Sequence, residues 1–322
     1  MAVRLGFIGV GWVATRHFQA LDEIPEAQIV ACADADADLA AERAARFAGA
    51  GAYTDYREML DKQELDAVYV CVPPHVHGEI ELALIERGMP FFLEKPLGNE
   101  RETPRRILAA LEGKDLLTGV GYMMRYQDTV ERVRELLAGD EPVVARGAYL
   151  GGMPGKDWWR RKGQSGGQIV EQSTHVYDLT RYLFGDVESV FCMARRDLIQ
   201  GVEPYDGDDA SVCLMRFESG LLCEISSSCT VDRAEISLEV FTRKARAKLT
   251  GVSLDLTLAL EGETTQVTGA RDTFVEEDRA FVNALLGGDA SAIKSPYADA
   301  FRTQMVTCAA NESMESGQAE KP

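Results

Sequence analysis

The stretch GFIGVGWVATRH, residues 6–17, joins an apolar run to a segment with helical spacing through a glycine-rich turn. Gly9 permits a tight turn, Gly11 lets the backbone approach a pyrophosphate, and the small Ala14 allows close packing of the helix on a sheet. The start of the helix offers free N–H groups to phosphates. This strand–turn–helix context is the one that a dinucleotide site requires, so the stretch predicts a Rossmann domain.

The second apolar run, residues 27–34, ends in an acid, Asp34. An acid at this place accepts hydrogen bonds from the adenosine ribose hydroxyls and repels a 2′-phosphate. Asp36 adds negative charge and no arginine follows directly, so the sequence favours NAD over NADP. Asp34 could instead cap the next helix, although Asp36 or Asp38 would cap it equally well.

Strands and helices alternate through the first third of the chain. Continuous apolar runs at residues 3–10, 27–34, 65–74 and 89–93 are separated by single segments with helical spacing. Strands that are apolar throughout indicate a parallel sheet with helices on both faces. We therefore predict a dinucleotide-binding Rossmann domain over residues 1–121.

The pattern changes near Tyr122. Short strands then follow one another through turns rich in Gly, Ser, Asp and Arg, which predicts an open, mainly antiparallel sheet beside a few helices. Residues 122–322 are therefore predicted to form a substrate-binding and oligomerisation domain, and the protein is of the α/β class. The closing helix, residues 295–316, is a candidate to pack back on the first domain.

Composition narrows the classes of partner. The 322 residues carry a net charge of −18, so a nucleic-acid backbone would be repelled. No uninterrupted apolar segment approaches the roughly 20 residues of a membrane helix. The N-terminus enters a strand pattern at once, so we expect no signal peptide. Seven cysteines without a CxxC pair argue against a disulfide framework and favour a reducing cytoplasm.

The stretch LEKPLGN, residues 93–99, follows a strand of the second half of the predicted parallel sheet. It lies at the carboxyl edge of that sheet, where ligands bind in open α/β folds. Lys95 can donate a hydrogen bond to a reacting oxygen there, Glu94 can orient Lys95, and Pro96 can restrict the turn. The alternative is an exposed surface lysine.

His175 lies in a helical segment between two acids, Glu171 and Asp178. The spacings i, i+4 and i, i+3 place all three side chains on one face of a helix. Neighbouring carboxylates can orient a histidine and raise its basicity, as a general base needs. The alternative is a helix histidine with solvated acids around it.

The other three histidines are less informative. His17 lies within the first helix, where packing or solvation explains it. His75 and His77 fall where a strand meets its helix, and they could be polar residues of the helix start or line the cofactor. No cysteine or second histidine neighbours His175 in the sequence, so no metal site is predicted.

Together these motifs resemble the glucose–fructose oxidoreductase/inositol dehydrogenase (Gfo/Idh/MocA) oxidoreductases. The resemblance covers essentially the whole chain and also rests on CVPPHVHGE (71–79), MMRY (123–126), WWRRKGQSGGQ (158–168) and SPYADAF (295–301). It implies an N-terminal Rossmann domain and a C-terminal α/β domain with an open, mainly antiparallel sheet. Members oxidise a secondary alcohol of a sugar or cyclitol, or reduce the matching ketone, with NAD(H) or NADP(H).

Within this resemblance Lys95 matches the catalytic lysine and His175 the catalytic histidine. The family has a D-x-G-x-H pattern at that histidine, whereas this chain has Glu171 and Ser173 in place of Asp and Gly, which leaves the catalytic role of Glu171 open. The expected cofactor-binding residues are Gly9, Gly11, Trp12, Val13, Ala14, Asp34, Pro73, His77, Glu94, Lys95, Trp159 and Arg160. The expected substrate-contacting residues are Lys95, Arg125, Tyr126, Trp158, Glu171, His175 and Asp178.

The expected reaction is hydride transfer between a nicotinamide cofactor and a secondary alcohol or ketone of a sugar, glycoside or cyclitol. His175 would take the hydroxyl proton and Lys95 would stabilise the developing alkoxide. Two alternatives stay open. Some relatives use NAD transiently in a net non-redox reaction such as glycoside cleavage, and others are sensors that bind the dinucleotide without turnover. The presence of both Lys95 and His175 argues against a sensor.

The C-terminal half has few helices with which to cover both faces of its sheet. The resemblance also favours face-to-face packing of such sheets between subunits. We therefore expect a homodimer or homotetramer joined through the C-terminal sheets. The strand residues that are too apolar for a wholly solvated sheet include Val212, Leu214, Ile225, Ile236, Leu238 and Val240.

Overall fold

The computed structural model describes residues 2–322. The chain divides into two compact units, and each is described by itself. Unit 1 comprises Met1–Leu97, Glu102–Met123 and Asp272–Ala300, and unit 2 comprises Gly98–Arg101, Met124–Arg271 and Phe301–Pro322. The predicted boundary at residues 121 and 122 falls beside this division, but the chain also returns to unit 1 at residue 272.

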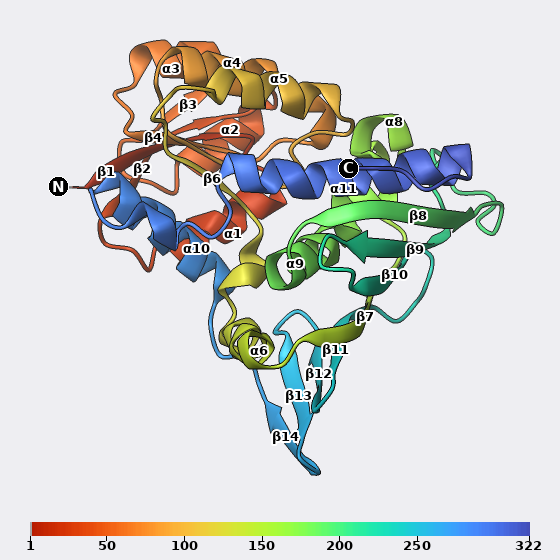
Figure 1. The fold of residues 1–322 in the computed structure, drawn as a ribbon. Coiled ribbons are helices and arrows are strands. Elements are labelled where there is room, and N and C mark those ends of the chain that lie inside the picture. The colour runs from red at the N-terminus through yellow and green to blue at the C-terminus, as the bar shows by residue number, and fades with distance from the viewer. Residues whose placement is uncertain (1) are drawn as a thin grey trace. The chain divides into compact units, whose positions relative to one another are not determined.

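Unit 1 is built on a parallel six-stranded sheet in the order β3-β2-β1-β4-β5-β6, which confirms the predicted Rossmann architecture. Strands β1, β4, β5 and β6 are almost wholly buried because helices cover both faces, whereas the edge strand β3 has no buried residue. Figure 1 shows α3, α4 and α5 along one face and α1 and α10 on the other. The strands are β1 Val3–Ile8, β2 Ala27–Ala33, β3 Gly51–Tyr53, β4 Ala67–Val70, β5 Phe91–Leu93 and β6 Thr118–Val120.

The connecting helices of unit 1 are short. They are α1 Trp12–Leu21, α2 Ala37–Ala44, α3 Tyr56–Lys62, α4 Glu79–Glu86 and α5 Glu102–Leu111, with a 3-10 turn, η1, at Pro74–Val76.

The helix α10 (Thr273–Leu285) belongs to unit 1, although it follows all the strands of the second sheet in the sequence. Asp272 caps it by accepting hydrogen bonds from the backbone N–H groups of Phe274 and Val275. Phe281 and Val282 are fully buried in the same apolar core as Phe18 of α1. The sequence offered the last helix as the candidate to pack on the first domain and did not predict the return of α10. The returning segment ends in a 3-10 turn, η4, at Ala290–Ala292.

Unit 2 contains an eight-stranded sheet in the order β14-β13-β12-β11-β7-β10-β9-β8. All neighbouring pairs are antiparallel except β10 and β7, as the turn-rich sequence predicted. The strands are β7 Pro142–Leu150, β8 Val187–Arg195, β9 Ala210–Phe217, β10 Leu222–Ser228, β11 Glu235–Thr242, β12 Ala245–Thr250, β13 Asp255–Leu260 and β14 Glu263–Val267.

One face of this sheet is covered by helices and the other is open. The helices α6 (Asp128–Gly139), α9 (Thr174–Phe184) and α11 (Tyr297–Ser316) supply apolar side chains to the same core as the sheet. Burial alternates residue by residue along β9, as a strand with one covered face requires. Of the apolar residues singled out in the sequence, Ile225, Leu238 and Val240 are buried, Ile236 is partly buried, and Val212 and Leu214 are exposed.

Short helical turns precede α6 and α9. They are η2 Met123–Tyr126, α7 Asp157–Arg160, α8 Lys162–Ser165 and a π-helical turn, η3, at Ile169–Ser173. In the part of the chain that the structure describes, no helix is both long enough and apolar enough to cross a membrane.

Two of the seven cysteines form a disulfide. Cys192 of β8 and Cys213 of β9 occupy paired positions on neighbouring antiparallel strands, with their Cα atoms 4.1 Å apart. Cross-strand pairing places two side chains next to each other, so two thiols that are 21 residues apart in the sequence meet in the fold. The sequence argued against a disulfide framework and did not predict this single pair. The other five cysteines are free and buried.

Candidate active site

The glycine-rich turn of unit 1 has the geometry that a pyrophosphate needs. Gly9 has a φ of +81°, and a Cβ there would lie 2.5 Å from the carbonyl oxygen of Cys71, so no other residue fits without distortion. A Cβ on Gly11 would meet nothing within 4 Å, which leaves space above the turn. Gly11 is also the N-cap of α1, where no side chain occupies the first N–H groups.

The three residues that follow this turn differ in burial. Ala14 is fully buried against the sheet, Val13 is partly buried, and Trp12 is 77% exposed. The small Ala14 thus packs the helix on the sheet while Trp12 stays at the surface.

Asp34 holds its carboxylate at the same turn. It follows β2, and its two oxygens accept hydrogen bonds from the backbone N–H groups of Val10 (2.9 Å) and Asp36 (3.0 Å). The alternative role of Asp34 as a helix cap belongs instead to Asp36, whose side chain accepts from the N–H groups of Asp38 and Leu39 at the start of α2. The acid is therefore fixed beside the turn, where a ribose hydroxyl can reach it.

The segment after β4 carries two residues expected at the cofactor. Pro73 is partly buried and precedes the 3-10 turn. His77 is buried, and its Nδ1 lies 2.6 Å from the Glu81 carboxylate of α4. The Nε2 atom of His77 has no hydrogen-bond partner among residues 2–322. His75, the residue left open with it, is exposed.

Glu94 and Lys95 follow β5 at the carboxyl edge of the parallel sheet. Glu94 is buried, and its Oε2 accepts a hydrogen bond from the backbone N–H of Lys95 at 3.1 Å. Gly121 packs against this carboxylate so closely that a Cβ there would lie 2.6 Å from Glu94 Oε1. Lys95 itself is partly buried. The acid thus holds the backbone of the lysine, and its role in orienting the Lys95 side chain stays a prediction.

His17 is the residue of unit 1 whose role the sequence did not predict. It was expected to be packed or solvated, and it is packed: its side chain is fully buried. It also contacts the carboxylates of Asp278 and Glu94, which the sequence did not predict. These partners lie 261 and 77 residues away in the chain. No local pattern relates residues at such separations, so only the fold brings them together.

In unit 2, His175 and Glu171 lie at the start of one helical segment. His175 is partly buried near the N-terminus of α9, whereas Glu171 is buried in the π-helical turn that precedes it. A π turn hydrogen-bonds from i to i+5, so the α-helical i, i+4 geometry used to pair these residues does not describe this turn. Such turns often occur at functional sites.

Asp178, the other acid expected beside His175, has buried partners of its own. It is fully buried, and its oxygens accept two hydrogen bonds from Arg125, from Nε at 2.7 Å and from Nη2 at 2.5 Å. The Thr303 hydroxyl donates a third at 2.8 Å. Arg125 is also buried, with its guanidinium 5.0 Å from the ring centre of Tyr182. Arg125 and Asp178 were expected to contact substrate, and here they satisfy each other in a buried ion pair.

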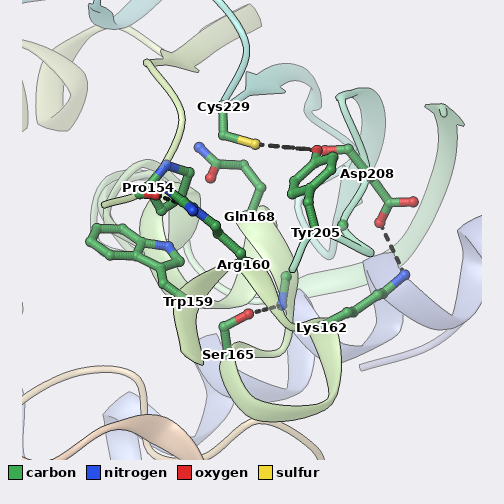
Figure 2. Close-up of a pocket in the computed structure, with 11 residues that line it drawn as sticks. Pro154, Trp159, Arg160, Lys162, Ser165, Gln168, Tyr205, Asp208 and Cys229 are labelled. Carbon is green, nitrogen blue, oxygen red and sulfur yellow. Dashed lines mark hydrogen bonds and ion pairs between the residues drawn. The ribbon is translucent and has the colours of Figure 1, made fainter. Parts of the chain in front are cut away.

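Trp159 of α7 lines a small cavity of unit 2, and Figure 2 labels it there together with Arg160 and Tyr205. The rings of Trp158 and Trp159 stack with centres 5.8 Å apart. Arg160 is held by a hydrogen bond from its Nε to the carbonyl of Pro154 at 2.6 Å. The cavity has space of about 10 Å³, room for one water rather than a sugar. Tyr126, the remaining expected contact, is buried.

Across the same cavity lie further polar contacts that Figure 2 draws. Lys162 Nζ lies 2.9 Å from Asp208 Oδ2, and the Tyr205 hydroxyl lies 3.5 Å from Cys229 Sγ. Burial raises the pKa of both Tyr205 and the Cys229 thiol, so both stay protonated near neutral pH.

Comparison with known proteins identifies the family. Residues 3–122 match the model described as an oxidoreductase family with an NAD-binding Rossmann fold, and residues 130–248 match the GFO/IDH/MocA C-terminal domain. The chain belongs to the Gfo/Idh/MocA oxidoreductases. Its first unit is accordingly an NAD-binding Rossmann domain.

This Gfo/Idh/MocA protein has relatives with assigned activities. It is 25% identical to the myo-inositol 2-dehydrogenase of Thermotoga maritima, over 99% of this chain and 98% of the relative. It is 26% identical to the levoglucosan dehydrogenase of Pseudarthrobacter phenanthrenivorans, over 70% of this chain and 67% of the relative. A solved levoglucosan dehydrogenase in complex with NADH has a TM-score of 0.89 at 22% identity, covering 100% of this chain and 99% of that one. At that identity the likeness shows the fold.

Proposed function

We propose that this protein is an NAD-dependent dehydrogenase that oxidises a secondary alcohol of a sugar, glycoside or cyclitol, or reduces the matching ketone. The observation that carries the proposal is Lys95 at the carboxyl edge of the parallel sheet, with its backbone held by the buried Glu94. The named activities of the relatives, on inositol and levoglucosan, support the substrate class.

The residues present fit a dinucleotide. Gly11 and the first N–H groups of α1 would hold the pyrophosphate, and Asp34 would accept hydrogen bonds from the adenosine ribose. An acid there disfavours a 2′-phosphate, which supports NAD over NADP. When bound, NAD supplies the hydride acceptor, and the protein supplies alignment and proton transfer.

His175 and Lys95 are the two side chains that take part in the proposed reaction. His175 takes the proton of the substrate hydroxyl, and the buried carboxylate of Glu171 lies in the helical turn that precedes it. The Lys95 ammonium donates a hydrogen bond to the same oxygen as negative charge develops on it. A preorganised donor of this kind typically lowers the barrier by about 2.7–4 kcal/mol. In the direction of ketone reduction, His175 returns the proton.

The test is a screen of sugars, cyclitols and glycosides with NAD and with NADP, followed by absorbance at 340 nm. With the best substrate, Lys95→Ala should lower kcat by at least about a hundredfold while the affinity for NADH stays within severalfold. Lys114→Ala, at an exposed lysine of the same unit, is the control and should retain full activity. Near-normal turnover by the Lys95 variant would remove this lysine from the mechanism.

A further inference from the structure

A buried histidine lies directly behind the lysine of the proposed site. His17, on α1, is fully buried, and its two ring nitrogens contact carboxylates from two other segments. Nδ1 lies 2.9 and 3.0 Å from the two oxygens of Asp278 on α10, and Nε2 lies 3.0 Å from Oε1 of Glu94. A side chain with both nitrogens so occupied links α10 to the end of β5.

Aromatic rings fix the plane of this imidazole. The rings of Tyr69, Phe92 and Phe274 lie edge-on to it with centres 5.2–5.3 Å away. Edge-to-face contacts of this kind restrict ring rotation, and the apolar surfaces exclude water from the two hydrogen bonds. The position of His17 therefore determines where Glu94 can place its carboxylate.

The chain of contacts continues to the lysine. One oxygen of Glu94 contacts His17, and the other accepts the backbone N–H of Lys95 at 3.1 Å. Gly121 closes the remaining side of the carboxylate, because a Cβ there would lie 2.6 Å from Oε1. Glu94 is thus held from three directions, and it is the residue that precedes Lys95.

The protonation of His17 supports this role. Burial lowers the pKa of an imidazole, but here the charge of Asp278 and the hydrogen bonds to Asp278 and Glu94 outweigh it and raise the pKa well above 6.5. A protonated imidazole donates from both nitrogens. It can therefore hold both carboxylates at once.

A metal ion is the competing explanation of the cluster. Among residues 2–322, His17, Glu94 and Glu277 are the one set of three or more His, Cys, Asp or Glu side chains whose possible metal-ligand atoms all lie within 4.8 Å of one another. A ligating histidine must offer an unprotonated nitrogen, whereas both nitrogens of His17 are within hydrogen-bond distance of carboxylates. Burial also raises the pKa of Glu277 well above 4.5, which disfavours the ionised form that a metal ligand needs. The geometry favours a hydrogen-bonded support over a metal site.

We propose that His17 is a positioning residue, which holds Glu94 and, through Glu94, fixes the backbone of Lys95 for catalysis. The proposal rests on the proposed function of Lys95. It adds that the turnover of this enzyme depends on a residue that touches neither substrate nor cofactor.

Two amide substitutions separate the two contacts of His17. Asn carries its amide nitrogen near the place of Nδ1 and can keep the Asp278 contact, whereas Gln reaches the place of Nε2 and can keep the Glu94 contact. His17→Asn should lower kcat between about tenfold and a hundredfold, as expected for a misplaced catalytic group, with KM and NADH affinity nearly unchanged. His17→Gln should retain most of kcat. The deuterium isotope effect on kcat should rise in the Asn variant, because the chemical step becomes more limiting.

Phe18→Leu is the matched control for lost stability. Phe18 is a fully buried neighbour in the same helix, so the substitution should lower the melting temperature without changing kcat or the isotope effect. Equal loss of kcat in His17→Asn and His17→Gln, or wild-type kcat in both, would overturn the proposal. So would a stoichiometric metal in the purified protein together with loss of turnover on chelation.

Crystal structures of the wild type and His17→Asn with NADH separate this proposal from the proposed function. A lost Glu94–Lys95 hydrogen bond and a displaced Lys95 support the positioning role, and an unchanged Lys95 overturns it. Wild-type protein that oxidises none of the polyols in the screen would contradict the proposed function, and these two structures would still decide the role of His17.

Discussion

The side chain of Asp34, beside the glycine-rich turn, is expected to determine whether the protein prefers NAD or NADP. The unmodified protein should give the higher kcat/KM with NAD, because the carboxylate meets a ribose hydroxyl and repels a 2′-phosphate. Replacing Asp34 by Ser and Ala35 by Arg should shift the preference toward NADP by removing the repulsion and adding a cation. A serine hydroxyl can still accept from the Val10 N–H, so the turn should survive. A wild type that already prefers NADP would contradict this reading of Asp34.

Glu277 makes the stability of unit 1 depend on pH. It is 1% exposed, neither of its oxygens has a hydrogen-bond partner among the described residues, and burial raises its pKa well above 4.5. The charged groups that act on it are His17, which lowers its pKa, and the acids Glu94, Asp278 and Asp272, which raise it. The unfolded chain releases this proton near pH 4.5 and the folded chain keeps it. The free energy of unfolding therefore falls by about 1.4 kcal/mol per pH unit between the two pKa values.

Glu277→Gln removes this titration with little change of shape. The variant and the wild type should melt at similar temperatures near pH 5, and the variant should melt higher at pH 8. Scanning calorimetry or dye-based melting across this range measures the difference. A difference that stays constant from pH 5 to pH 8 would show that Glu277 is not held neutral.

The sequence predicts the roles of some single residues better than those of others. Gly9, Gly11 and Asp34 lie within one strand–turn–helix–strand segment, so their spacing indicates their role. His17 meets partners far away in the chain, and Arg125 meets Asp178 across 53 residues. A pairing of that kind depends on which helices come together, and local periodicity does not carry that information.

Among the larger elements, apolar runs predicted the sheets well because burial on both faces or on one face leaves a clear pattern. The π-helical turn at Ile169–Ser173 was not predictable from side-chain spacing, since Glu171 and His175 fit an α-helix equally well. The return of α10 to unit 1 was missed for another reason. Its apolar face looks the same in sequence whichever sheet it covers.

At one contact between β7 and α9, the residue of β7 is a glycine, Gly147. A Cβ on Gly147 would lie 2.8 Å from Cγ1 of Val176, the residue next to His175. Gly147→Ala should therefore push α9 from the sheet, cost about 1–3 kcal/mol of stability, and lower kcat severalfold. Val176→Ala in the same chain removes the obstructing methyl groups and should restore part of both losses. Gly155→Ala, where a Cβ meets nothing within 4 Å, is the control.

Melting temperature and kcat of the two single variants and the double variant form a double-mutant cycle. Strict additivity of the two substitutions would show that Gly147 and Val176 do not share this contact. A coupling energy above about 0.5 kcal/mol would support it.

At the scale of the whole molecule, the open face of the second sheet exposes apolar side chains that a binding partner would bury. Met193, Val212, Leu214 and Leu222 are 47–67% exposed on β8, β9 and β10. Met193 pairs with Val212 across the strands, so the apolar side chains are contiguous. We predict that a second copy of the chain covers this face, burying more than about 1,000 Å² in a dimer or tetramer.

Light scattering at micromolar concentration tests the assembly. The wild type should show a multiple of the 35.3 kDa chain mass. Leu214→Glu, in the centre of the face, should give monomers, and Val252→Glu, at an exposed turn residue, should not. A wild-type mass near that of one chain would mean that this face is solvated.

The late return of α10 has a consequence for how the protein is made. All six strands of the first sheet leave the ribosome before the second sheet is synthesised, but the face that carries α1 stays without Phe281 and Val282 until the segment after residue 272 emerges. Over the same interval His17 has no Asp278 carboxylate to accept from it. The domain that begins first is thus completed late, and nascent chains stalled before residue 272 expose an apolar surface. That stage of translation is where chaperone binding and aggregation should concentrate.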